Sequence, residues 1–349
     1  MCIRDSLKGM LVKDWSINGL NIVGLFCISI LILYLAMNFT YNQSPFPIGF
    51  DSRNFYMNIS KQVALKEGLI YGFRPYNWAI LMSMGFVIFK STAVGLSLSF
   101  YGYILSLFAI FHLGARRLKI NPNHVLLAML VLTASPAITN QLYVELKTDF
   151  GLLFFQILTV SFFLSFVSSD RCKAYMRSTQ IEKAKLKALS PYLIILGLFV
   201  GFGLGIKMTN MFLLFSIIIC LFWLFNDDKI LTSGVILLTL ALFMIVRLDD
   251  LSGVRLYHLG LNSILMVLLG SGVVAMGYSL YRNRNAVFKP FVLVCCIGLI
   301  SMTTMSPWLI KNFNETRSLS PKTLLNGAPA GPDININTLH NNYINSLDN

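Results

Sequence analysis

The sequence predicts an all-α fold, a polytopic bundle of transmembrane helices, and two observations carry this prediction. Of the 349 residues, 56% are hydrophobic and only 12% are charged, whereas an ordinary soluble domain carries about 25% charged residues. Long apolar runs also recur from one end of the chain to the other, which is typical of membrane-spanning helices. So few charges cannot cover a water-exposed surface, and we therefore expect lipid to solvate the excess apolar area.

Nine apolar runs are predicted to span the membrane, and a shorter run is not. The run 76–89 has about 14 residues and would be ~21 Å long as a helix, which is short of the ~30 Å hydrocarbon core. We predict that it is re-entrant or lies at the interface; if it crosses, the topology changes. The nine predicted spans cover residues 17–37, 93–114, 122–141, 150–168, 189–206, 211–225, 230–246, 259–281 and 290–308.

Basic residues in short loops predict the orientation, because cytoplasmic loops collect Lys and Arg. Three clusters, at 116–119, 171–187 and 282–289, should be cytoplasmic together with the N-terminus, residues 1–16. The transmembrane domain then covers 17–310 and has a long outer loop at 39–92. Residues 1–6 resemble a translated sequencing-adapter remnant and do not enter the fold prediction. The polar tail, residues 311–349, has no helical period and is predicted to be an irregular outer loop.

The basic balance does not indicate a nucleic-acid partner. The net charge of +13 is explained by cytoplasmic loops, and no basic stripe interleaves with aromatic residues. The six cysteines and four histidines show no metal-ligand spacing, so no metal site is predicted from them. Tryptophans lie near predicted span ends, as in an aromatic belt, and glycines gather in the predicted span 189–206, where they would permit close helix packing.

Ionisable residues gather at the predicted outer face, where they could bind a phosphate-bearing lipid. They are Asp51 beyond the first span, Glu145 and Asp149 in a second outer connection, and Lys207 at the end of an apolar run. An acid there could act as general base and a cation could bind phosphate oxygens. Each has a plainer interpretation: a solvated loop acid, helix-end charges with Asp149 capping the helix that follows, and a lysine reaching the headgroups.

Four segments in order resemble the GT-C superfamily of membrane glycosyltransferases, in particular the bacterial enzymes similar to protein mannosyltransferases and the lipid A aminoarabinose transferase. Three positions depart from the family pattern, at Ser52, Phe55 and Lys311. The four segments are Asp51–Phe55 with the helix-like stretch after it, Gly72–Trp78 with its Arg74-Pro75 pair, the glycine-rich Gly197–Thr209, and Ser306–Asn312 with its Pro307-Trp308 pair.

This resemblance implies sugar transfer from a polyprenyl-phosphate-linked donor to a hydroxyl of a lipid, glycan or protein. Asp51 would deprotonate the acceptor and the anomeric carbon would invert. Arg74 and Lys207, with Arg53 in second rank, would stabilise the donor phosphate. Glu145 and Asp149 would bind the acceptor or orient a divalent cation, the one cofactor that the resemblance suggests.

The resemblance also implies a location and a larger protein. It places the chain in a bacterial inner membrane, with the active face periplasmic. Family members continue beyond the Pro-Trp motif, so we expect this chain to be a fragment. The rival hypothesis is a multi-spanning transporter or lipid flippase, which would place ionisable residues near the bilayer midplane. A structural subunit is the third alternative and gives Asp51 no role.

Overall fold

The computed structural model is all-helical wherever it describes the chain, at residues 20–42, 56–70, 76–143, 148–178, 182–225, 228–245, 261–319 and Leu324. No strand occurs among these residues, so the predicted fold class is confirmed for them. The chain divides into two compact units. Unit 1 comprises residues 1–61 and 78–200, and unit 2 comprises residues 62–77 and 201–349.

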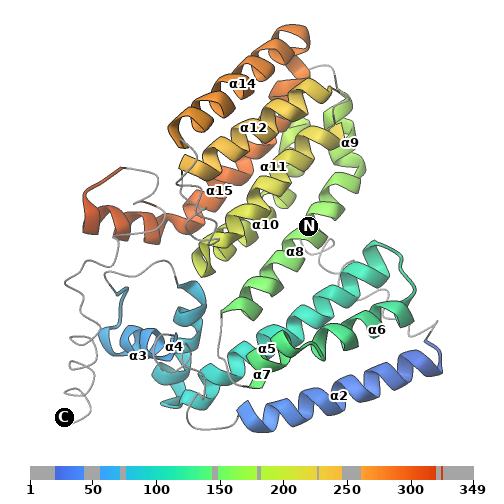
Figure 1. Ribbon diagram of the computed structural model, residues 1–349, viewed down its shortest axis with the longest axis vertical. Coiled ribbons are helices and arrows are strands. Elements are labelled where there is room, and N and C mark those ends of the chain that lie inside the picture. The colour runs from blue at the N-terminus through green and yellow to red at the C-terminus, as the bar shows by residue number, and fades with distance from the viewer. Residues whose placement is uncertain are drawn as a thin grey trace. The chain divides into compact units, whose positions relative to one another are not determined.

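Unit 1 is built around the long helix α5. Helices α2 and α6 pack on each other and on α5, and α8 also packs along α5 (Figure 1). A π-helical turn, η2, continues α5. The elements that lie in or begin this unit are α2 (Ile22–Asn42), α3 (Met57–Lys66), α4 (Asn77–Phe89), α5 (Thr92–Phe111), η2 (His112–Arg117), α6 (Pro122–Thr133), α7 (Pro136–Tyr143), α8 (Asp149–Ser168), α9 (Asp170–Arg177) and α10 (Lys183–Ile206).

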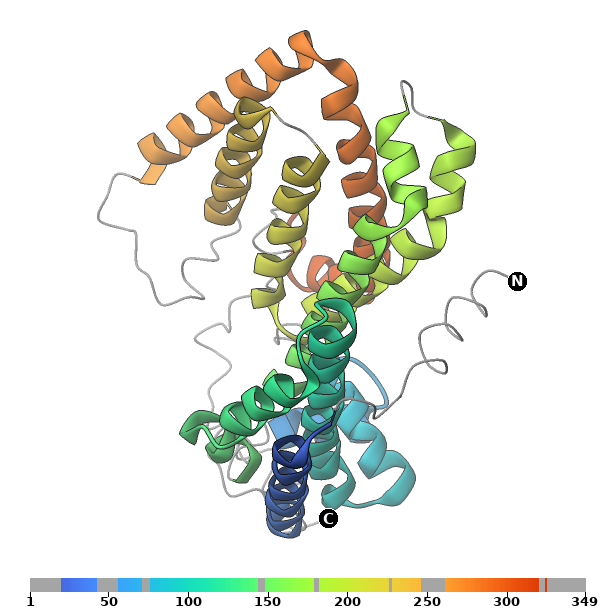
Figure 2. The ribbon, with the colours of Figure 1, turned by 90° about the vertical axis from the view of Figure 1, so that its right-hand side faces the viewer.

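Unit 2 combines residues 62–77, which include the end of α3, with a longer part that begins inside α10 and continues through a short 3₁₀ turn into four further helices. Helices α12 and α14 lie side by side in both ribbon views (Figure 2). They approach closely because Gly234 of α12 faces α14 and Gly272 of α14 faces α12. A Cβ added at either glycine would lie only about 3 Å from an atom of the neighbouring helix. The elements are η3 (Met208–Asn210), α11 (Met211–Phe225), α12 (Lys229–Ile245), α14 (Leu261–Arg282) and α15 (Arg284–Thr316).

Six described helices are long and apolar enough to cross a membrane, and a seventh span results if the bent pair α6–α7 is counted as one. Nine spans were predicted. The difference lies in this bent pair and in α11 and α12, which have only 15 and 17 residues. Helices of that length rise roughly 22 to 26 Å, which is less than the hydrocarbon core. Helix α4 has 13 residues and was predicted to be too short.

The predicted span 122–141 is not one straight helix, because the chain bends by 69° between α6 and α7. The sequence Ala134-Ser135-Pro136 lies at the bend. A proline disfavours the helical conformation of the residue before it and has no N–H to donate. The break therefore follows from Pro136, and the Thr139 N–H restarts the helix by donating to the carbonyl of Ser135 at 2.9 Å.

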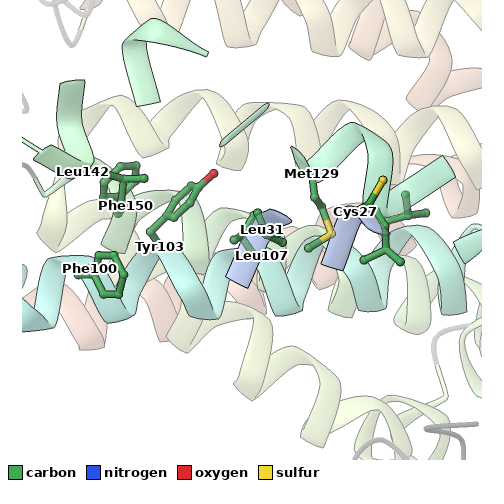
Figure 3. Packing of buried hydrophobic residues seen from close by; sticks show 10 residues of the cluster. Cys27, Leu31, Phe100, Tyr103, Leu107, Met129, Leu142 and Phe150 are labelled. Carbon is green, nitrogen blue, oxygen red and sulfur yellow. The ribbon is translucent and has the colours of Figure 1, made fainter. Parts of the chain in front are cut away.

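The core of unit 1 is a row of apolar side chains between α2, α5, α6 and the start of α8. Leu31, Leu107 and Met129 lie together at the middle of this row, and Tyr103 and Phe150 lie further along it (Figure 3). The rings of Tyr103 and Phe150 are 4.7 Å apart. All of these side chains are at most 8% exposed, so the four helices share one packed centre.

Helix α8 approaches α4 closely because Gly151 leaves room for an indole. The Trp78 side chain is 4% exposed and its Nε1 donates to Ser99 Oγ at 3.2 Å. A Cβ on Gly151 would overlap the Trp78 ring. By contrast, a Cβ on Gly277 in α14 would meet no atom within 4 Å.

We expect Gly151→Ala to lower the free energy of unfolding by about 1–3 kcal/mol, as overpacking of a well-filled core does. Thermal unfolding of the detergent-solubilised protein, followed by far-UV circular dichroism, measures the change. Gly277→Ala is the matched control, and it should be neutral or stabilising by up to ~1 kcal/mol because alanine favours helix more than glycine does. Equal melting temperatures for the two variants would contradict the packing assigned to Gly151.

Candidate functional site

Most of the residues predicted for the site lie outside the described residues. These are Asp51, Arg53, Arg74 and Glu145. The structure describes Asp149 in unit 1 and Lys207 in unit 2. The predicted convergence of the whole set on one cavity therefore stays a prediction.

Asp149 is the first residue of α8, and the residue at the N-cap position is Thr148. The suggestion that Asp149 caps a helix starting at Phe150 is thus wrong by one position, whereas its interpretation as a helix-end charge is confirmed. A carboxylate in the first turn is stabilised by the partial positive charge of the helix N-terminus, typically by 0.3–1 kcal/mol.

Lys207 lies where α10 ends and the chain turns into η3. Its backbone is extended, with φ −155° and ψ 130°, and the side chain is half-buried. The Lys207 N–H donates to the carbonyl of Gly203 at 3.0 Å, and the Asn210 N–H donates to the carbonyl of Lys207 at 3.0 Å. Lys207 therefore lies at a helix end, as the apolar run before it predicted, and the structure shows that a hydrogen-bonded turn holds its backbone there.

Within unit 2, the side chain of Asn77 joins three separate segments of the chain. Trp308 Nε1 donates to Asn77 Oδ1 at 2.7 Å, and Asn77 Nδ2 donates to the carbonyl of Phe202 at 3.1 Å. These segments are the second, third and fourth of the four that resemble the glycosyltransferases. The amide uses both its donor and its acceptor, which fixes the start of α4 against α10 and α15.

Glycines of α10 make this close approach possible, as the sequence predicted for close helix packing. A Cβ on Gly205 would overlap the Asn77 amide, and a Cβ on Gly201 would lie 2.7 Å from the carbonyl of Ser301. A Cβ on Gly203 would likewise overlap the side chain of Asn210. Three glycines on one helix end therefore each serve a different contact in unit 2.

Tyr76 packs beside Asn77 against the same tryptophan. The rings of Tyr76 and Trp308 are 4.5 Å apart and meet edge to face. The Tyr76 hydroxyl accepts from the N–H of Ile70 and donates to the carbonyl of Ile70 at 3.5 Å. Burial raises the pKa of Tyr76 to about 12, opposed by the Ile70 hydrogen bond and assisted by the charge of Glu315, so the phenol stays neutral near pH 7.

Trp308 and Trp78 do not belong to an aromatic belt. Their side chains are 2% and 4% exposed and lie in the interiors of the two units, whereas Trp223 is 64% exposed. The aromatic-belt prediction is therefore wrong for the two buried tryptophans, because both indole N–H groups have partners inside the protein.

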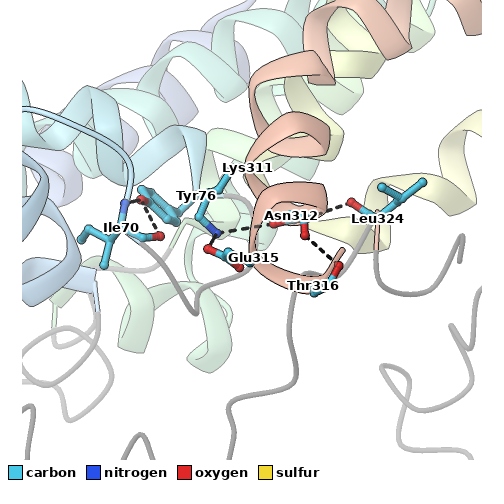
Figure 4. Close-up of polar contacts among 7 residues, drawn as sticks. All are labelled: Ile70, Tyr76, Lys311, Asn312, Glu315, Thr316 and Leu324. Atoms are coloured by element: carbon cyan, nitrogen blue, oxygen red, sulfur yellow. Dashed lines mark hydrogen bonds and ion pairs between the residues drawn. The ribbon is translucent and has the colours of Figure 1, made fainter. Parts of the chain in front are cut away.

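A buried ion pair lies beside Trp308 in α15. Lys311 Nζ lies 2.8 Å from Glu315 Oε1, and the two side chains are 4% and 6% exposed. Lys311 Nζ also lies 3.4 Å from Asn312 Oδ1 and 5.9 Å from the centre of the Trp308 ring. Asn312 Nδ2 donates to the carbonyl of Leu324 at 2.8 Å, as Figure 4 shows.

This pair corrects the prediction that an irregular loop begins at Lys311. Helix α15 continues to Thr316, so the first six residues of the predicted tail, 311–316, are helical. The spacing of Lys311 and Glu315, four residues apart, places both side chains on one face of the helix. That spacing indicates a helix that continues past Lys311. The Asn-rich composition of the residues that follow led to the prediction of a loop instead.

The chemistry that the described site offers is polar recognition beside an apolar wall. It combines a neutral phenol, a carboxamide, an indole N–H and a buried lysine–glutamate pair, and Lys207 belongs to the same unit. The described residues contain no group of three or more His, Cys, Asp or Glu side chains that could hold a metal ion. The chain matches no family model, no curated protein and no solved structure.

We expect loss of either member of the buried pair to lower the free energy of unfolding by about 3–5 kcal/mol, because the remaining charge is left buried without its partner. Lys311→Met and Glu315→Leu are the single variants. The double variant should recover most of the loss, since two apolar side chains of similar volume replace the pair. Chemical or thermal unfolding in detergent gives the coupling energy of this double-mutant cycle.

The control for this cycle is the pair Lys185–Glu182, which has nearly the same distance, 2.7 Å, but side chains that are 38% and 46% exposed. The cycle of Lys185→Met and Glu182→Leu should give a coupling energy below about 1 kcal/mol, as exposed pairs do. A coupling energy at Lys311–Glu315 no larger than at this control would show that burial does not strengthen the pair.

Proposed function

We propose that the protein is a membrane glycosyltransferase that moves a sugar from a polyprenyl-phosphate-linked donor to a hydroxyl acceptor at the outer face of the membrane. The contact of three resemblance segments around Asn77 carries this proposal. The three segments meet through two directional hydrogen bonds of the half-buried Asn77 amide. Their meeting supports the interpretation of the four segments as parts of one site.

The resemblance gives each predicted residue a role in this reaction. Asp51 takes the proton of the acceptor hydroxyl as that oxygen attacks the anomeric carbon, whose configuration inverts. The bond to the donor phosphate breaks, and Arg74 and Lys207 stabilise the charge that the phosphate gains. Arg53 assists them, and Glu145 and Asp149 orient the acceptor or a divalent cation.

The distribution of charge along α15 favours an interfacial site over a transporter. Transporters hold their substrates and coupling ions near the bilayer midplane. In α15 the residues from Pro290 to Ile310 include no Asp, Glu, Lys or Arg, and the buried pair follows directly after them. An ionisable pair buried at the end of an uncharged run is the arrangement expected where a site meets the membrane surface.

Asp51→Asn should reduce sugar transfer by about 10²- to 10⁴-fold, because the neutral amide cannot accept the proton of the acceptor. The measurement is transfer of labelled sugar from a polyprenyl-phosphate donor by the purified chain in liposomes. Circular dichroism should show unchanged helix content, so that loss of activity is separated from loss of fold.

Asp170→Asn is the matched control, because Asp170 is an exposed carboxylate in the first turn of α9 and should retain activity within about twofold of the starting protein, a change of less than ~0.5 kcal/mol. Undiminished transfer by Asp51→Asn would remove Asp51 as the base. Absence of transfer by the unaltered chain, together with substrate uptake into the liposomes, would favour the transporter instead.

A further inference from the structure

We propose that a groove between α2, α5 and α6 in unit 1 binds one anionic glycerophospholipid of the surrounding bilayer, with its acyl chain in the groove and its phosphate at Arg116. None of the residues that line the groove is assigned a role in sugar transfer, and the proposal does not depend on that activity. Its basis is the shape of the groove, the position of Arg116 in its lining, and the absence of acidic residues from the helices that line it.

The groove has a volume of about 410 Å³ and an almost wholly apolar lining. Its floor is the packed row of Leu31, Leu107 and Met129, which Figure 3 shows side by side. Its rim includes Ile32 and Phe108, whose side chains are 61% and 53% exposed. A packed floor with an open apolar rim suits a flexible hydrocarbon chain that enters from the lipid.

Arg116 is the one charged residue among those that line the groove, and it lies at one end. Leu20, just before α2, and Pro122, the first residue of α6, also line the groove. The end of α5 and η2 therefore meets the starts of α2 and α6. Both of these starts carry the partial positive charge of a helix N-terminus, which adds to the attraction for an anion.

The dimensions agree with a lipid tail that runs away from this end. Along α2 the groove reaches Leu35, so from Ile22 it covers about 20 Å at 1.5 Å per residue. One leaflet contributes about 15 Å of the ~30 Å hydrocarbon core. A headgroup held at Arg116 therefore leaves the tail in the groove over the full depth of its leaflet.

The charged side chains on the helices that line the groove favour an anionic ligand. Neither residues 20–42 nor residues 68–144 contain an Asp or a Glu, and these ranges include all of α2, α5, η2 and α6. Arg117 and Lys119 follow Arg116 directly and are exposed. Basic residues at the end of membrane helices bind anionic headgroups, each contributing about 1 kcal/mol near the surface.

The backbone turn that carries Arg116 is unusual in a way that fits a binding site. Residues 112–117 form a π-helical turn, in which the Leu118 N–H donates to the carbonyl of Leu113 at 2.9 Å. A Cβ on Gly114 would lie 2.9 Å from a Val125 methyl group, so the turn packs tightly on α6. Single π-helical turns occur frequently at functional sites because they redirect side chains from the regular helical positions.

The test compares phosphatidylglycerol with phosphatidylcholine as ligands of the purified full chain, by native mass spectrometry and by lipid-dependent thermal stabilisation in detergent. The unaltered protein should bind phosphatidylglycerol at least about fivefold more tightly. In Arg116→Gln the two lipids should bind within about twofold of each other. Ile32→Trp, whose ring has room at the exposed rim, should weaken both lipids equally because it fills the space of the tail.

Arg171→Gln is the matched control, because Arg171 is an exposed arginine of the same unit outside the groove, and it should keep the preference for phosphatidylglycerol. Three results would overturn the proposal. They are equal binding of the two lipids by the unaltered protein, an equal loss of preference in Arg171→Gln, and displacement of bound phosphatidylglycerol by an equimolar polyprenyl phosphate, which would make that lipid the occupant.

Discussion

The structure depends on one constraint, that a backbone polar group in lipid has to find its hydrogen-bond partner inside the protein. The helices satisfy this for the main chain, and most of their hydroxyl side chains satisfy it locally. Ser106, Thr159 and Ser301 each donate to the carbonyl four residues earlier, at 2.6–2.9 Å. Ser106 also donates to the carbonyl of Phe150 at 3.3 Å, which joins α5 to α8. Polar contacts between segments distant in the sequence therefore have a large part in fixing the fold of the described residues.

Asn77 in unit 2 is the clearest of these contacts. Its carboxamide is half-buried, and its bonds to Trp308 and Phe202 tie the start of α4 to two other helices. Gly205 is needed at that point because any side chain there would occupy the space of the amide. The helix ends two residues later, at Lys207, where the backbone N–H and carbonyl of Lys207 find their partners in the hydrogen bonds of the turn.

The sequence predicted the helices well where apolar runs end at charges or polar turns. Helix α11 has the predicted bounds, 211–225, and α8 starts one residue earlier than predicted. Hydropathy did not predict the bend at Pro136, because apolar residues continue on both sides of it. It also did not predict the helical residues 311–316, because the composition of the tail beyond them outweighed the Lys311–Glu315 spacing.

The site was less predictable than the helices for a physical reason. A base or a phosphate ligand can be suggested from a charge near a span end, as with Lys207. The partners of a neutral amide or of an aromatic ring cannot, because Asn77 and Tyr76 contact segments more than 100 residues away through packing. Only the structure identifies the segments that meet and the atoms that join them.

The uncharged part of helix α15 has the length needed to cross a membrane, and this observation does not depend on the family resemblance. Residues 290–310, 21 in number, separate Lys289 from Lys311 and contain no other charge. At 1.5 Å per residue they rise about 32 Å, which matches the ~30 Å hydrocarbon core. A helix that crosses with these residues in the core puts its two lysines at opposite boundaries. Lysines at a boundary commonly reach out to the headgroups, yet these two are 4% and 6% exposed. Lys311 avoids the cost of burial through Glu315, one turn further on, so the end of α15 presents a neutral polar pair to the interior of unit 2.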